Sequence, residues 1–135
     1  IGAVKVIQQA LKALKASESA SILLFSTVAV QTGLSFHASV ASSKGAIEGL
    51  GKSLAAELAP KVRVNVIAPS LTDTPLAERL LSNDQKKEAN AERHPLKTIG
   101  SAENMAAAAV FLLTDHSSWI TGQVLTIDGG LGSLR

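Results

Sequence analysis

Hydroxyl and amine side chains gather around one stretch of the chain, from Ser26-Thr27 to Ser42-Ser43-Lys44. The first pair follows a short apolar run that is typical of a buried strand, and the second opens a helical pattern. Ligands of open α/β sheets bind beyond the carboxyl ends of the strands, so a hydroxyl there is well placed for a substrate. We expect Lys44 to lie in the first turn of the helix, where the helix dipole disfavours a cation. A lysine kept at an unfavourable position suggests that it has a function. Spacing alone leaves a solvated lysine as an equal alternative.

The histidines offer little else. His37 has the pKa range of a general acid or base, whereas we expect His94 and His116 to be loop residues. The letters of a catalytic triad occur in Asp115-His116-Ser117, but adjacent side chains point apart and cannot form one. With no cysteine and three dispersed histidines, no metal site is expected.

A glycine pattern at Gly45, Gly49 and Gly51 resembles a phosphate-binding loop. Such a loop must leave a strand directly and open a helix, so that free N–H groups meet the phosphate. Here the pattern falls in the middle of a predicted helix, where those groups are already bonded. We interpret it as a stripe of small residues that lets another helix approach closely.

Hydrophobic periodicity predicts the elements that position these residues. Helices are expected at 3–15, at 42–58 and from 101 on with its stripe at Met105, Ala108, Ala109 and Leu112; strands are expected at 21–26, 62–68 and 124–127. Between them lie a loop at 28–40, a turn at 115–118 and a long irregular stretch at 70–100 with short helices near 76–81 and 85–93. A stretch that long suggests a lid or binding segment.

The connections between the three strands hold about 35 and about 55 residues and contain helices, which favours parallel strands. We therefore expect a three-layer α/β fold with a small parallel sheet, and one domain over residues 1–135. Because the first residue is Ile1, the chain is expected to be a piece of a longer protein.

Composition excludes several classes of protein. The 135 residues are 46% hydrophobic and 18% charged, which excludes a disordered chain. The net charge is only +2 and the Lys and Arg are scattered, so neither a nucleic acid nor a membrane surface is an expected partner. No apolar run reaches membrane-spanning length. The absence of cysteine fits a reducing compartment, and we expect a cytoplasmic protein.

Three motifs, in order, carry a family resemblance: Ser21 to Lys44, Asn65 to Pro75, and Trp119-Ile120-Thr121-Gly122-Gln123 to Asp128-Gly129-Gly130. Together the chain resembles the C-terminal half of a short-chain dehydrogenase/reductase, over essentially all its residues. The resemblance implies half of a doubly wound Rossmann fold, with the first two helices on one face of the sheet. It places the last helix on the other face, which makes the final crossover left-handed, the rare hand.

The resemblance also implies catalytic roles. The family uses a Tyr-x-x-x-Lys pair, with a Ser thirteen residues before the Tyr. Lys44 matches the Lys, and Thr27 stands at the position of the Ser. Val40 stands at the position of the Tyr, and the chain contains no tyrosine. His37, three residues before Val40, is the alternative proton donor, or else a loop histidine without a role.

Cofactor residues follow in the same way. The segment that lines the nicotinamide in the family corresponds to Pro69-Ser70, followed by Thr72 and by Thr74 at the carboxamide position. NAD or NADP is the implied cofactor. The family's N-terminal half, with its Gly-rich pyrophosphate loop, has no counterpart here, so binding to this chain alone is expected to be weak or absent.

Two functions remain open at this stage. The first is an NAD(P)-dependent oxidoreductase for carbonyl or hydroxyl substrates, of which this chain is the substrate-side half and inactive alone. The second is a non-catalytic remnant that acts by self-association. Because the strand at 22–25 would have an open edge, we expect either a homo-oligomer or pairing with the missing half.

Overall fold

A computed structural model describes residues 1–134. The elements in chain order are α1 (Gly2–Ala16), β1 (Ala20–Phe25), α2 (Ala29–Thr32), α3 (Ala38–Leu58), β2 (Val62–Pro69), β3 (Thr72–Asp73), the 3-10 helix η1 (Pro75–Leu80), α4 (Asp84–Glu92), β4 (Gly100–Ser101), α5 (Ala102–Leu113), the 3-10 helix η2 (Asp115–Ser117) and β5 (Val124–Ile127). The predicted α/β class is confirmed. No helix in this described part is long and apolar enough to cross a membrane.

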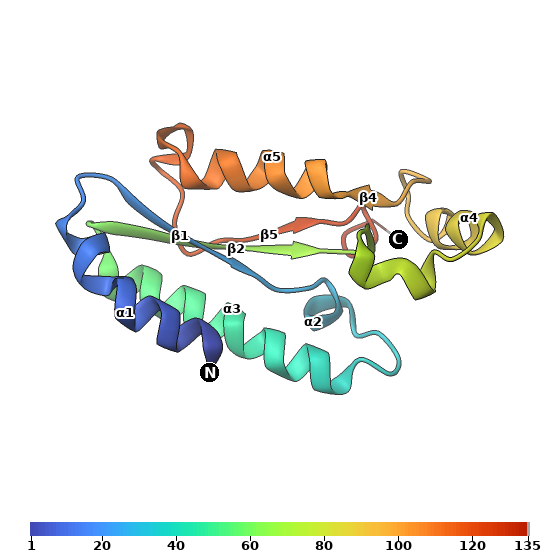
Figure 1. Cartoon of the computed structure of the whole chain (residues 1–135), viewed down its shortest axis with the longest axis horizontal. Helices are drawn as coiled ribbons and strands as arrows, with labels where there is room; N and C mark the ends of the chain where they lie inside the picture. Colours follow the sequence, from blue (N-terminus) through green and yellow to red (C-terminus); the bar gives the residue numbers. More distant parts are fainter. Residues whose placement is uncertain (135) are drawn as a thin grey trace.

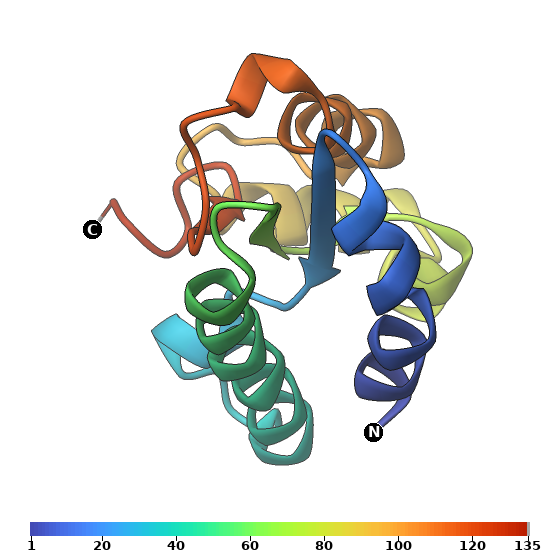
Figure 2. The same ribbon diagram turned by 90° about the vertical axis from the view of Figure 1, so that its left-hand side faces the viewer.

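The main sheet has three parallel strands in the order β1-β2-β5. Helices α1 and α3 cover one face and α5 covers the other (Figure 1; Figure 2). The chain steps across the sheet in one direction, but its two crossover helices lie on opposite faces. The two crossovers therefore have opposite hands, and the second one, through α5, is the left-handed one that was expected.

The core lies between the sheet and the pair α1 and α3. Central strand β2 is buried on both faces, and Val64 and Ile67 have no exposed surface. Strand β1 instead alternates: Ala20, Ile22 and Leu24 are buried on the α1–α3 side, whereas Phe25 is 45% exposed. The expectation that β1 would be buried on both faces is thus only partly right, because α5 leaves part of this edge strand uncovered.

Helix α3 begins earlier than expected. It starts at Ala38 rather than Ser42, after an N-cap position at His37 whose side chain makes no capping bond. A sequence signal for this start is therefore missing, since caps are recognised by Ser, Thr, Asp or Asn. The 28–40 loop also holds one short helix, α2, packed on α3.

The 70–100 stretch is more ordered than its sequence suggests. A two-stranded parallel sheet pairs β3 with β4, joining Thr72 to Gly100 and Asp73 to Ser101. Between them lie η1 and α4, close to the short helices expected there. The segment leaves the carboxyl end of β2 and returns to the start of α5 (Figure 1).

Arg63 fixes the other end of α5. Its guanidinium donates to the carbonyl oxygens of Leu112, Ser117 and Thr114, at 3.0, 3.0 and 3.1 Å, and to the Ser117 hydroxyl at 2.8 Å. These include carbonyls at the end of a helix that have no partner within it. The central strand thus supplies the C-terminal cap of the helix that covers it.

Candidate active site at the carboxyl ends of the strands

The three parallel strands bring separate segments together at their carboxyl ends. Backbone bonds continue past β1, from Ser26 N to Ile67 O at 2.7 Å and from Val28 N to Pro69 O at 3.1 Å. On the other side, Ser70 N donates to Ile127 O at 3.2 Å. Thr27 and Ser70 therefore follow neighbouring strands at one edge of the sheet, where open α/β sheets bind ligands.

Lys44 reaches this edge from α3. Its ammonium donates to the carbonyl oxygen of Phe25 at 2.9 Å, two residues before Thr27. Because α3 begins at Ala38, Lys44 lies in the second turn of the helix, not the first. The argument that a cation here opposes the helix dipole is therefore wrong, since the dipole effect falls off within the first turn. The observed contact with Phe25, rather than the dipole, now makes Lys44 a site candidate.

Ser26 and Glu48 hold α3 against the end of β1. The buried Ser26 hydroxyl donates to the Glu48 carboxylate at 2.6 Å. Glu48 lies one helical turn beyond Lys44, so this bond fixes the part of α3 that carries the lysine. The adjacent Thr27 hydroxyl accepts from Ala29 N at 3.3 Å and is half-buried.

The first turn of α3 carries Val40 and, just before it, His37. Val40 is 45% exposed and His37 is fully outside the core. His37 Nδ1 lies 2.7 Å from the Ser35 carbonyl, so that nitrogen is the donor. Residues 37, 40 and 44 share one side of the helix by their spacing.

Thr72 and Thr74 lie on the segment that follows β2. The Thr72 hydroxyl donates to the Ser70 carbonyl at 3.1 Å, and the Thr74 hydroxyl donates to the Thr72 carbonyl at 3.4 Å. Both are half-buried, as are Pro69 and Ser70. These bonds shape the turn that leaves the sheet.

His94 is the residue that the sequence did not single out. It is 3% exposed, and its Nε2 lies 2.8 Å from the Ser70 hydroxyl oxygen, 24 residues away along the chain. Its Nδ1 lies 2.8 Å from the carbonyl oxygen of Asn90 at the end of α4. His94 lies in a loop after α4, as expected, but this contact was not expected because no short-range pattern joins residues across the 70–100 segment.

The glycine pattern lies inside α3, as expected, but only Gly45 faces another helix, so the expected helix-packing stripe is right only in part. A Cβ at Gly51 would lie 2.8 Å from Val66 Cγ2, so this glycine lets the helix approach the sheet. Gly45 would contact Val30 of α2, and Gly49 has nothing within 4 Å. The residues meet a strand and a short helix, and no strand-to-helix phosphate loop forms here.

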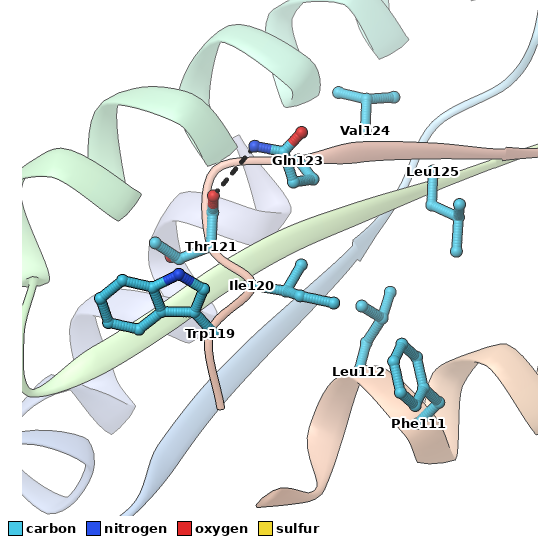
Figure 3. Close-up of a pocket in the computed structure, with 8 residues that line it drawn as sticks. All are labelled: Phe111, Leu112, Trp119, Ile120, Thr121, Gln123, Val124 and Leu125. Atoms are coloured by element: carbon cyan, nitrogen blue, oxygen red, sulfur yellow. Dashed lines mark hydrogen bonds between the residues drawn. The ribbon is translucent and has the colours of Figure 1, made fainter. Parts of the chain in front are cut away.

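A separate apolar hollow lies between α5 and the segment leading into β5. It measures about 420 Å³ and is lined from α5 and the segment leading into β5 by Phe111, Leu112, Trp119, Ile120, Thr121, Gln123, Val124 and Leu125. Figure 3 shows mostly apolar side chains, with one bond from Gln123 to the Thr121 carbonyl at 3.2 Å. It holds no titratable group and lies away from the site residues.

The donor set at the carboxyl ends fits the nicotinamide side of a dinucleotide. It presents an ammonium at Lys44 and hydroxyls at Thr27, Ser70 and Thr74, which suit a ribose and a carboxamide. Within residues 1–134, no Gly-rich turn runs from a strand straight into a helix. These residues therefore do not include the kind of loop whose N–H groups bind a pyrophosphate. Over the same residues, no group of acidic or histidine side chains could hold a metal ion.

Comparison with known proteins identifies related sequences. The family described as enoyl-(acyl carrier protein) reductase matches residues 1–132. L-xylulose reductase from Bos taurus is 40% identical over 110 residues, which cover 81% of this chain and 45% of that protein. The 3-oxoacyl-[acyl-carrier-protein] reductase of Thermotoga maritima is 36% identical over 131 residues, covering 96% of this chain and 52% of the relative.

Solved structures agree. The aldohexose dehydrogenase of Thermoplasma acidophilum, in ligand-free form, superposes with a TM-score of 0.92 at 33% identity, over 99% of this chain and 56% of that one. A gluconate 5-dehydrogenase from Burkholderia cenocepacia, in complex with NADP and tartrate, superposes with a TM-score of 0.86 at 28% identity, over 95% and 51%. The chain thus spans about half the length of the relatives it matches. By sequence and by fold, it belongs to the short-chain dehydrogenase/reductase family of oxidoreductases.

Proposed function

We propose that this chain is the substrate-side half of an NAD(P)-dependent oxidoreductase that acts on a carbonyl or hydroxyl group, and that it is inactive alone. The observation that supports this proposal is that Thr27, Lys44 and Ser70 all lie at the carboxyl end of the parallel sheet. The NADP complex of the related gluconate 5-dehydrogenase supports the cofactor. Residues 1–135 would form one partial Rossmann-like domain. An N-terminal half would complete its cofactor site.

The roles of this chain's own residues follow from their chemistry. The Thr27 hydroxyl would donate a hydrogen bond to the substrate oxygen, and the Lys44 ammonium would bind the ribose and stabilise negative charge nearby. Pro69, Ser70, Thr72 and Thr74 would line the carboxamide side. A bound nicotinamide supplies or accepts hydride.

Proton transfer is the weak point of this arrangement. Val40 has no titratable group, and general acid–base catalysis is typically worth about 10²–10⁴-fold in rate. His37, one turn before Val40 and exposed, is our candidate for a substitute proton donor. Without it, a slow enzyme would fall close to the uncatalysed rate.

Nicotinamide fluorescence gives the direct test. Titration of NADH and of NADPH with the purified chain should show no saturable binding at micromolar concentrations, because the pyrophosphate lacks its anchor. Substrate-dependent NAD(P)H oxidation by the chain alone would contradict its proposed inactivity. If that oxidation is lost in His37→Gln but kept in His116→Gln, His37 is the proton donor.

A self-associating, non-catalytic module is the second candidate, and the apolar surfaces favour it. The outer edge of β1 is unpaired within residues 1–134, and Phe25 on it is 45% exposed. Between α1 and α3 lies a groove of about 290 Å³, lined by Val4, Ile7, Gln8, Leu11, Lys15, Leu50, Leu54, Glu57 and Leu58. An open apolar edge recruits another chain.

We therefore propose a homo-oligomer, or a complex with an N-terminal half, in the cytoplasm. Light scattering on the purified chain should give a mass above 13.9 kDa at micromolar concentration. Val4→Glu, in the groove, should lower that mass, whereas Glu88→Gln on exposed α4 should not. A monodisperse monomer would exclude the homo-oligomer.

A further inference from the structure

Ser70, His94 and the Asn90 carbonyl form a polar chain in which the carbonyl sets the tautomer of a neutral His94. A carbonyl oxygen only accepts hydrogen bonds, so His94 Nδ1, 2.8 Å from the Asn90 carbonyl, must carry a proton. In the neutral imidazole, Nε2 is then an acceptor. The Ser70 hydroxyl, 2.8 Å away, donates to it. The histidine is thus in the tautomer that takes a proton from the serine.

The surrounding backbone holds the imidazole in this position. Leu96 N donates to the Gly129 carbonyl at 3.1 Å, and Lys97 N donates to the His94 carbonyl at 2.8 Å. Gly129, at φ 59°, lies so close that an added Cβ would sit 3.4 Å from His94 Cβ. His94 is 3% exposed and therefore has little freedom to turn. The base is held, while the half-buried Ser70 remains reachable from solvent.

A hydroxyl, a base within hydrogen-bond reach and a third group that orients the base are the signature of an activated nucleophile. Here the third group is a backbone carbonyl. Ser70 also sits immediately beyond the carboxyl end of the central strand. Within residues 1–134, the N–H of Leu71, directly after it, makes no hydrogen bond. The amide after a nucleophile is a common donor to the oxyanion of acyl transfer.

We propose that Ser70 is a nucleophile activated by His94, and that it accepts an acyl group from a small uncharged carboxylic ester. Its Oγ bonds to the ester carbonyl carbon as its proton passes to His94 Nε2. The C–O bond to the alcohol breaks, and the alcohol leaves with that proton. Water then attacks the acyl-serine, gives a proton to His94, and releases the acid as Ser70 regains its hydrogen. No oxidant or reductant is consumed.

This activity goes beyond the proposed oxidoreductase, because it needs neither a nicotinamide nor another half of a Rossmann domain. An uncharged ester is the class expected, because the polar groups bonded around Ser70 are a hydroxyl, an imidazole and backbone amides. Either result of the NAD(P)H titration would leave the acyl-transfer proposal unchanged. A negative result in the acyl-transfer experiment would likewise leave the oxidoreductase assignment unchanged.

The experiment uses a fluorophosphonate probe and p-nitrophenyl acetate on the purified chain. Intact mass should show one phosphonate adduct, and peptide mapping should place it on Ser70. Ser70→Ala should abolish the adduct, and His94→Gln should slow labelling and acetate release by about 10²-fold or more. Ser118→Ala removes an exposed serine as the matched control and should label at the wild-type rate.

Circular dichroism of each variant checks that it folds. If Ser70→Ala or His94→Gln unfolds, the mapped position of the wild-type adduct decides instead. An adduct on another residue, no adduct at all, or equal labelling of wild type and a folded Ser70→Ala would each overturn the proposal. In that case the pair only ties the 70–100 segment to the sheet.

Discussion

The two ends of the parallel sheet use polar side chains differently. At the amino end, Arg63 gives its hydrogen bonds to carbonyls and a hydroxyl around the end of α5, and Asn65 bridges Ile120 and Gln123. At the carboxyl end, Thr27, Lys44 and Ser70 each have partners but remain half-buried. The polar groups at the amino end hold α5 and the segment before β5 against the sheet, whereas those at the carboxyl end remain within reach of a ligand.

This contrast teaches how to separate structure from chemistry within one fold. A polar group whose hydrogen-bond partners all belong to the fold has a structural role, and its loss lowers stability. A group with access to solvent and a titratable neighbour can change partners during a reaction. Stability measurements should therefore respond mainly to the amino end, and reactivity mainly to the carboxyl end.

The largest effect should come from Arg63→Met. The substitution removes four hydrogen bonds from a charged donor, three to carbonyl oxygens and one to the buried Ser117 hydroxyl, so the free energy of unfolding should fall by about 3 kcal/mol. Urea denaturation followed by circular dichroism measures it. Arg93→Met, at an exposed position, should cost less than about 0.5 kcal/mol. Equal losses in the two variants would remove the contrast between the two ends.

A second variant probes the packing between the two ends. Gly51→Ala would place a Cβ 2.8 Å from Val66 Cγ2, where helix and central strand are in contact, and should cost about 2 kcal/mol. Gly49→Ala, two residues away with nothing within 4 Å, should instead stabilise the protein by about 0.5–1 kcal/mol. Thermal unfolding of both variants should shift in opposite directions. A shared direction would mean that α3 is not held against β2 as described.

Two serines allow the ends to be compared directly. Ser117, 1% exposed, bonds the carbonyls of Leu112 and Thr114 and accepts from Arg63, so Ser117→Ala should cost about 2 kcal/mol. Ser70→Ala, at the half-buried carboxyl end, should cost about 1 kcal/mol. Denaturant midpoints of the two variants give the ranking, and the reverse order would place the structural role at the carboxyl end.

The smallest effect concerns pH. Bonds from its own backbone N–H and from the Ser101 hydroxyl lower the pKa of Glu103, in the first turn of α5. A carboxyl with a lowered folded pKa adds stability above its unfolded pKa, and that stability is lost as pH falls through the folded pKa. Wild type should therefore be slightly more stable than Glu103→Gln at pH 7 and equal to it in strong acid. Thermal midpoints across this range test the sign.

Much of the fold follows from the sequence because it depends on short-range patterns. The apolar run before Pro69 marks the central strand, and Ser101 with Asn104 makes the capping box that starts α5. The start of α3 did not follow, because His37 makes no side-chain cap. That single error moved Lys44 into the wrong helical turn.

The candidate site follows from the sequence only in part. Thr27 and Lys44 stand out by their places after a strand and near the start of a helix, and the family motif suggests their roles, which remain proposals. The bond between Ser70 and His94 could not be predicted, because it joins the two ends of an irregular segment. The pairing of Thr72 with Gly100 also could not be predicted, because strands of two residues are too short to show a periodicity.

The parallel register also sets how this chain must reach its folded state. Ala20 pairs with Val62, and Val66 pairs with Val124, so neither strand pair can form until a long intervening segment has been closed into a loop. Loop closure costs entropy before the pairing compensates for it, and chains with such distant contacts fold slowly. We expect α3 and β2, which are neighbours along the chain, to organise first. The docking of β5, and with it the turn at Gly129 that holds His94, would then be the late step of folding.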